Sequence, residues 1–166
     1  SNRKFQIFNK KMNLQEKGII IRKTIASDLR QIYNEGIAEP FLADVKTPFT
    51  PDKLAELFAS RNVITFTALR GKKILGFITG IIIHKECRIE WIMVKKSFRK
   101  AGIGTKMLHL FLENAKNSGA EHFFIAVFMN NSESVNFFNK RGFTVQKTIL
   151  ELYRNSDKNF FPGLTE

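Results

Sequence analysis

A single cysteine, Cys87, stands in this chain of 166 residues, so a disulfide framework and a cysteine-rich metal site are both excluded. The three histidines have no ligand spacing, which argues against a metal enzyme. The sequence lacks the roughly 20 consecutive apolar residues of a membrane span. Its start carries charges without the apolar stretch of a signal peptide. We therefore expect a cytoplasmic protein that has no metal site and does not enter a membrane.

Hydroxyl-bearing aromatic residues are also scarce, since 17 phenylalanines stand against two tyrosines and one tryptophan. The apolar fraction of 43% is nevertheless that of a globular chain that can bury a core. Cys87 lies among strand-like residues without a feature that would activate a thiolate, so we interpret it as structural. The formal net charge of +12 favours polyanionic partners, which include nucleotide cofactors, RNA and acidic proteins. A general enrichment in lysine would explain the charge equally well.

Apolar residues recur with the periods of strands and helices along most of the chain. Alternating and β-branched segments predict strands at 19–23, 63–69, 74–83, 87–94 and 121–128, and one long strand or two at 143–153. Helical spacing predicts a first helix capped by Ser27-Asp28, a second that opens at Thr50-Pro51, a long one between Gly104 and Ser118, and a short one at 132–141. The strands between 63 and 94 have short connections and so predict an antiparallel meander, which a strand–helix–strand unit follows.

The most informative run is Arg99-Lys100-Ala101-Gly102-Ile103-Gly104-Thr105, which follows a strand and opens the long helix. Its glycines allow a ligand to approach the backbone closely, and the N–H groups and dipole at the start of a helix favour an anion. Lys95, Lys96 and Lys106 add positive charge. The spacing is neither that of a P-loop nor that of a dinucleotide fingerprint, whose third glycine is replaced by Met107. The run therefore suits a pyrophosphate group.

This run matches in full the motif Arg/Gln-x-x-Gly-x-Gly/Ala of the GNAT acetyltransferase superfamily, which the chain resembles. Residues 131–143 match most of a second family motif, Asn-x-x-Ala-x-x-Phe/Leu-Tyr-x-x-x-Gly-Phe, at the correct spacing. The order of elements also agrees from Ile19 to Tyr153. The resemblance implies an α/β (α+β) GNAT fold. In that fold a mixed, mostly antiparallel sheet of about six or seven strands is flanked by about four helices and splayed between its fourth and fifth strands.

The resemblance also implies which residues hold acetyl-CoA. The backbone near Val94 would pair with the pantetheine arm, the amides of 99–104 would hold the pyrophosphate, and the Thr105 hydroxyl would lie near the phosphates. Asn131 would contact the end of the pantetheine, and Phe137 or Phe138 would pack near the thioester. The expected cofactor-binding residues are Met93, Val94, Arg99, Lys100, Ala101, Gly102, Ile103, Gly104, Thr105, Asn131, Phe137 and Phe138.

Two positions depart from the second motif. Ser134 replaces alanine, which is a mild change, and Phe138 stands where the family often has a tyrosine that is thought to protonate the departing thiolate. Phenylalanine cannot donate a proton. A thiol with a pKa near about 8.5 can nevertheless leave as a thiolate that water protonates. We therefore expect a slower reaction rather than a forbidden one, and neither Tyr33 nor Tyr153 is assigned the role.

Glu90 is the predicted catalytic base. It precedes Val94 on the same strand, and it resembles the glutamate that removes the amine proton, directly or through water, in relatives that acetylate polyamines and small amines. A strand carboxylate that pairs with Arg88 or with a lysine is the alternative interpretation. His84 and Glu86 are weaker candidates for the base.

The sequence therefore predicts an N-acetyltransferase that transfers the acetyl group of acetyl-CoA to a primary amine by direct attack in a ternary complex. The amine would belong to a small molecule, a polyamine-like compound, or a protein N-terminus or lysine. Two alternatives remain: a CoA-binding module with weak catalysis, motivated by Phe138, and a ribosome- or RNA-associated acetyltransferase, motivated by the charge. No RNA-recognition signature is present, so nucleic-acid binding is not the expectation. We predict a catalytic domain at 18–154 between an arm at 1–17 and a tail at 155–166, and the resemblance is compatible with a homodimer.

Overall fold

The computed structural model describes residues 14, 18–34, 52, 56 and 58–148. These form two compact units, one up to Ala126 and one from Val127 onward. The predicted arm and tail lie outside the described residues except for Leu14, whose side chain is buried and whose carbonyl accepts a hydrogen bond of 2.9 Å from the Ile19 N–H. Within the described residues, no helix is long and apolar enough to cross a membrane.

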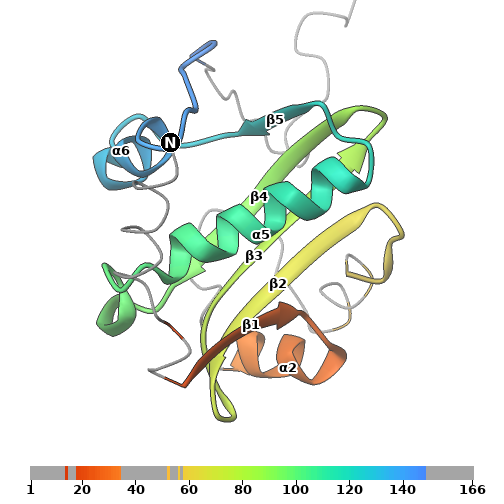
Figure 1. The fold of residues 1–166 in the computed structure, drawn as a ribbon, viewed down its shortest axis with the longest axis vertical. Helices are drawn as coiled ribbons and strands as arrows, with labels where there is room; N and C mark the ends of the chain where they lie inside the picture. Colours follow the sequence, from red (N-terminus) through yellow and green to blue (C-terminus); the bar gives the residue numbers. More distant parts are fainter. Residues whose placement is uncertain (1–13, 15–17, 35–51, 53–55, 57, 149–166) are drawn as a thin grey trace, which may run out of the picture. The chain divides into compact units, whose positions relative to one another are not determined.

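A five-stranded sheet forms the framework of the first unit, and its strands lie side by side in chain order (Figure 1). The strands are β1 (Ile19–Lys23), β2 (Val63–Arg70), β3 (Lys73–Ile83), β4 (Glu86–Val94) and β5 (His122–Ile125). The first four strands are antiparallel, whereas β4 and β5 pair in parallel. Short connections between β2, β3 and β4 favour this antiparallel arrangement. The predicted meander and the mixed α/β sheet are thus confirmed.

The helix α2 (Ala26–Asn34) begins ahead of its predicted cap pair, Ser27-Asp28. Asp28 lies inside the first turn, and its carboxylate accepts a hydrogen bond of 2.9 Å from the Ile25 N–H, the residue before the helix. The same carboxylate accepts two hydrogen bonds from Arg22, at 2.6 and 2.9 Å. A side chain in the first turn that reaches back to the residue before the helix is half of a capping box. The predicted cap position is therefore corrected, because Asp28 acts from within the helix.

The two main helices of the first unit cover opposite faces of the sheet. The helix α5 (Ile103–Asn117) lies across the sheet in Figure 1, and its buried apolar stripe includes Phe111. Gly80 of β3 faces this stripe, since a Cβ at that position would lie 2.6 Å from the Phe111 Cζ. Successive side chains of a strand point to opposite faces. Phe77 accordingly lies on the other face, where it packs in a buried cluster with Ile32 of α2.

The second unit contains the helix α6 (Ser132–Asn139). The strand predicted at 143–153 is wrong for residues 143–148, which form no strand with any described residue, and residues 149–153 lie outside the description. Apart from the half-buried Phe143, these positions are exposed, and β-branched composition favours a strand only where a partner strand is available. The predicted strand at 121–128 is shorter than expected and ends at Ile125.

The described residues form five strands, where about six or seven were expected. They also form three α-helices, and a fourth helix is indicated by helical backbone at Asp52, Glu56, Phe58 and Ala59.

Candidate functional site

The second half of β4 has an open backbone edge among the described residues. β5 pairs with β4 only as far as Ile89, so residues 90–94 have a partner strand on the β3 side alone. The Lys95 N–H donates to a β3 carbonyl at 2.8 Å. Backbone polar groups alternate in direction along an antiparallel strand, so Val94 and Ile92 direct theirs to the open side. This edge can accept an extended ligand as an added strand.

Glu90 is the extra residue of a β-bulge. Thr79 pairs with Trp91 and Gly80 pairs with Ile89, which leaves Glu90 without a partner residue on β3. A bulge bends the strand and redirects the side chain that it carries. The bulge at Glu90 directly follows Ile89, the last residue of β4 that pairs with β5, so the open edge of β4 begins at the bulge.

The carboxylate of Glu90 accepts a hydrogen bond of 2.6 Å from the Arg88 Nε. The Glu90 side chain is 26% exposed and the Arg88 side chain is 63% exposed, so solvent reaches the ion pair. The two weaker candidates lie elsewhere: Glu86 begins β4, and His84 lies in the turn before it with a positive φ of 55°. Glu86 and Val94 are separated by the length of β4, roughly 26 Å at about 3.3 Å per residue.

The loop between β4 and α5 has an unusual backbone conformation. A single 3-10 turn, η1 (Lys96–Phe98), leads to an extended Arg99, after which Lys100 and Gly102 adopt left-handed φ values of 62° and 84°. Glycine adopts this conformation without steric cost, whereas in lysine the Cβ lies close to the following carbonyl oxygen and raises the conformational energy. The loop also contacts the strand edge, because the Arg99 Nε donates to the Val94 carbonyl at 3.1 Å.

The start of α5 provides backbone donors and positive potential. The first hydrogen bond within the helix runs from the Lys106 N–H to the Gly102 carbonyl at 3.0 Å, so the N–H groups of Ile103 and Gly104 precede the helical ladder. The Ile103 side chain is buried and anchors this end in the core. The first turn contains no acidic residue that would neutralise the helix dipole. This geometry is that of an anion-binding helix start.

The second unit holds the remaining predicted residues. The Asn131 side chain caps α6 by accepting a hydrogen bond of 3.1 Å from the Ser134 N–H. Phe137 and Phe138 meet edge to face with their centroids 5.1 Å apart, and Phe138 is 4% exposed. The Arg141 guanidinium stacks 3.7 Å above the centroid of Phe137, and its burial lowers the pKa of this group. The aromatic pair therefore forms a packed core within its own unit.

The family model of the acetyltransferase (GNAT) family matches residues 27–143 of this chain. The chain belongs to this family. It is therefore an acyltransferase with acetyl-CoA as its cosubstrate. The β4 edge and the start of α5 described above lie within the matched residues.

Solved structures of low sequence identity share the GNAT fold. The chain is similar to the aminoglycoside acetyltransferase meta-AAC0020 from an uncultured soil metagenomic sample, at 18% identity and a TM-score of 0.70 over 84% of this chain and 97% of that chain. It is similar to the PaiA N-acetyltransferase of Thermoplasma acidophilum, solved with coenzyme A, at 21% identity and a TM-score of 0.69 over 79% and 92%. It is also similar to an acetyltransferase of Trypanosoma brucei at 20% identity and a TM-score of 0.65 over 82% and 99%.

The first unit brings most of the predicted site residues together. Val94 ends β4, residues 99–102 form the loop, and Ile103, Gly104 and Thr105 begin α5. The Met93 side chain packs against the buried cluster on the α2 face. Asn131, Phe137 and Phe138 lie in the second unit, so their roles in this GNAT protein stay predictions.

Ile92 is a candidate that the sequence analysis did not name. Its backbone groups point to the same open side as those of Val94, since the two residues stand two apart on one strand. The signal in the sequence that identifies Ile92 is the two-residue alternation along a strand, counted back from Val94. The position of the bulge was needed to apply that signal, because a bulge interrupts the alternation.

Proposed function

We propose that this GNAT protein transfers the acetyl group of acetyl-CoA to a primary amine by direct attack within a ternary complex. One observation carries the proposal: a single short loop connects the open edge of β4 to the start of α5, whose geometry suits an anion. CoA needs both features, because its pantetheine arm contains amides that pair like a strand and its pyrophosphate is anionic. The amides of Ile103 and Gly104 would hold the pyrophosphate, with the charge of Lys100 nearby.

The open edge also supplies the groups that would orient the thioester. Val94 and Ile92 would pair with the pantetheine amides, and a β4 N–H would donate to the thioester carbonyl oxygen as negative charge develops on it. The Val94 carbonyl accepts from Arg99 in the structure, so a pantetheine N–H that bonds there shares or replaces this donor. Holding both reactants on one rigid strand supplies much of the rate enhancement in such a reaction.

Glu90 would accept the proton of the attacking ammonium, either directly or through a water molecule. The amine nitrogen then forms a bond to the acetyl carbon and gives up its second proton to water, and the bond from that carbon to the CoA sulfur breaks. Arg88 holds the carboxylate at 2.6 Å, and a cationic acceptor would compete with it for the same oxygens. The thiolate leaves without a tyrosine donor, because the second family motif has Phe138 at the position of that tyrosine, and water protonates the thiolate.

The acceptor class follows from the charge of the proposed base. A partly exposed carboxylate beside the thioester favours an amine that is protonated before reaction, such as a polyamine, an aminoglycoside, or a lysine or N-terminus of a protein. The name of the soil acetyltransferase records aminoglycosides as acceptors of that relative. We therefore place aminoglycosides in the acceptor panel beside polyamines and peptides.

The test is a thiol-release assay with acetyl-CoA and a panel of polyamines, aminoglycosides, amino acids and peptides. We expect one amine class to give turnover, and we expect Glu90→Gln to lower kcat/KM for that amine by about 10²–10⁴-fold. Glu86→Gln is the matched control, because it makes the same change on the same strand at its far end. If no amine releases CoA, the proposed transfer is refuted. If Glu86→Gln and Glu90→Gln lose activity equally, the role of Glu90 is refuted.

Phe138→Tyr tests the absence of a proton donor. Tyrosine keeps the ring and adds a hydroxyl, so the rate of amine-dependent release should stay level or rise if thiolate departure limits the reaction. Phe138 is almost fully buried, and the added hydroxyl needs a hydrogen-bond partner. A thermal unfolding measurement therefore accompanies the kinetics and separates a folding defect from a catalytic one.

A further inference from the structure

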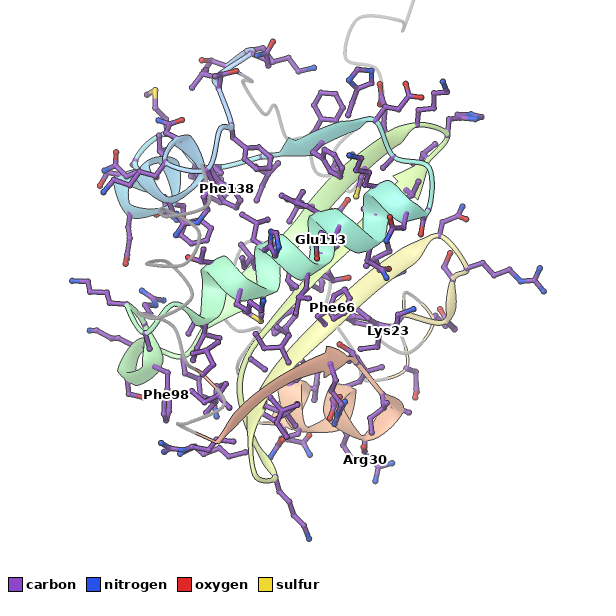
Figure 2. The ribbon with its side chains drawn as sticks, viewed as in Figure 1. Lys23, Arg30, Phe66, Phe98, Glu113 and Phe138 are labelled. Atoms are coloured by element: carbon purple, nitrogen blue, oxygen red, sulfur yellow. The ribbon has the colours of Figure 1, made fainter. Side chains whose placement is uncertain are left out.

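A second cationic surface lies near the start of α5, and the proposed reaction does not use it. It consists of Arg70, Lys73 and Phe98, which we name the Phe98 platform. The Arg70 guanidinium carbon lies 5.1 Å from the centroid of the Phe98 ring, and the Lys73 Nζ lies 5.8 Å from it. Figure 2 shows Phe98 beside the end of the sheet where β2 turns into β3.

The β2–β3 hairpin places two like charges directly opposite each other. Arg70 and Lys73 are register partners, and both residues are exposed. Like charges at opposed positions of antiparallel strands destabilise the pair. Neither cation has a carboxylate within ion-pair distance in the described part of the chain. The two cation–π contacts are of the same order as this repulsion, but they neutralise neither charge, so the platform is suited to an anion.

The surrounding sequence increases this positive potential. Segment 70–73 contains three cationic residues and segment 95–106 contains five, which makes eight in total, and neither segment contains an acidic residue. The η1 turn connects the two segments, because Phe98 of η1 contacts both cations of the hairpin. A concentration of one sign of charge on two adjoining segments raises the local potential for a polyanion.

We propose that the Phe98 platform binds the 3′-phosphate of CoA. This inference rests on the proposed function, because it requires CoA to be bound with its pyrophosphate at the start of α5. Phe98 immediately precedes Arg99, the first residue of the loop that leads to that helix. In CoA the 3′-phosphate and the diphosphate are attached to the same ribose. A ligand whose diphosphate occupies the start of α5 therefore has its third phosphate one ribose away, and the proposal places that phosphate at the platform.

The inference is tested with two ligands that differ only in this phosphate, CoA and 3′-dephospho-CoA. Their dissociation constants are measured by calorimetry at low salt. Wild type should bind CoA about tenfold more tightly, since charge-assisted contacts to one phosphate are lost in the other ligand. In Arg70→Gln/Lys73→Gln this preference should fall below about twofold, and the affinity for 3′-dephospho-CoA should stay at the wild-type value.

Arg30→Gln/Lys116→Gln is the matched control. It removes the same charge from exposed positions, and Lys116 lies at the opposite end of α5 from the loop, roughly 20 Å away at about 1.5 Å per residue. This variant should keep the preference for CoA. The unfolding temperature of Arg70→Gln/Lys73→Gln should stay close to that of wild type, because the change relieves a like-charge pair and removes two cation–π contacts of similar size.

Three results would overturn the inference. Equal affinity of wild type for the two ligands would show that the 3′-phosphate is not bound. An equal loss for both ligands in Arg70→Gln/Lys73→Gln would assign the two cations to another part of CoA. Loss of the preference in the control variant would assign it to net charge. A wild-type protein that binds neither ligand would instead refute the proposed function itself.

Discussion

Gly80→Ala should destabilise the protein, because the structure leaves no room for a methyl group at this position. A Cβ there would lie 2.5 Å from the Arg88 carbonyl oxygen, 2.6 Å from the Phe111 Cζ and 3.1 Å from the Ile89 Cα. Two of these atoms belong to the backbone of β4, and the third belongs to a ring that is fully buried. None of them can move far without shifting the strand or the helix.

The magnitude follows from two opposing effects. Overpacking a core costs about 1–3 kcal/mol, and the three close contacts place Gly80→Ala at the upper end. Alanine restricts the unfolded chain more than glycine does, which returns about 0.4–1 kcal/mol. The net loss is about 2 kcal/mol, which corresponds to a fall in Tm of about 4–8 °C for a chain of this size.

Thermal and urea unfolding of Gly80→Ala and wild type measure this loss. Gly71→Ala is the control, because its Cβ would meet no atom within 4 Å and the change tests only the left-handed backbone at φ 59°. Phe111→Leu should cost less in the Gly80→Ala background than in wild type, since the shorter side chain removes one of the three contacts. A Tm for Gly80→Ala within about 1 °C of wild type would refute the packing argument.

Three further predictions concern single side chains. Asp28→Ala should lower the free energy of unfolding in urea by about 2–3 kcal/mol, which is less than the loss of a fully buried pair because the Arg22 side chain is 37% exposed. Asp28→Asn should lower it by less than Asp28→Ala does, and equal losses in the two variants would contradict the ionic role. Lys100→Gly should be about 1 kcal/mol more stable than Lys100→Ala, because both variants remove the same charge and only glycine adopts the left-handed φ of 62° without strain. Equal stabilities of the two variants would exclude that strain. Burial raises the pKa of the Cys87 thiol from 9.0 to about 11. The folded state therefore keeps a proton that the unfolded state loses, and stability that is complete below pH 9 should fall by about 2–3 kcal/mol as the pH rises towards 11. Cys87→Ala should lack this component, so parallel pH profiles of the two proteins would contradict it.

The regular elements were largely predictable from the sequence, because their signals are local. The strand at 19–23 and the apolar stripe of α5 have periods that one segment carries by itself. The strand predicted at 143–153 failed over residues 143–148 for the opposite reason: the composition there is suitable, but the described residues supply no partner strand.

The position of the loop before α5 was predictable from the sequence, whereas the surroundings of Glu90 were not. Glycine spacing and the following helical period locate the loop within the sequence. The bulge at Glu90 depends on how β4 registers against Gly80, a residue on another strand, and no local pattern encodes that register. The Phe98 platform likewise combines the β2–β3 hairpin with the η1 turn. These two segments are distant in the sequence, and only the folded chain brings them together.

The burial of the only cysteine simplifies how turnover can be observed. Colorimetric thiol reagents react with accessible thiolates, and Cys87 is both fully buried and poorly ionised at neutral pH. The folded protein therefore gives no colour of its own, and every thiol that appears after an amine is added belongs to released CoA. In the absence of acetyl-CoA, the same reagent becomes a reporter of opening of the sheet around β4, since Cys87 reacts only when that part of the core is exposed. The same thiol reagent can thus measure acetyl transfer in one experiment and local opening of the folded protein around Cys87 in another.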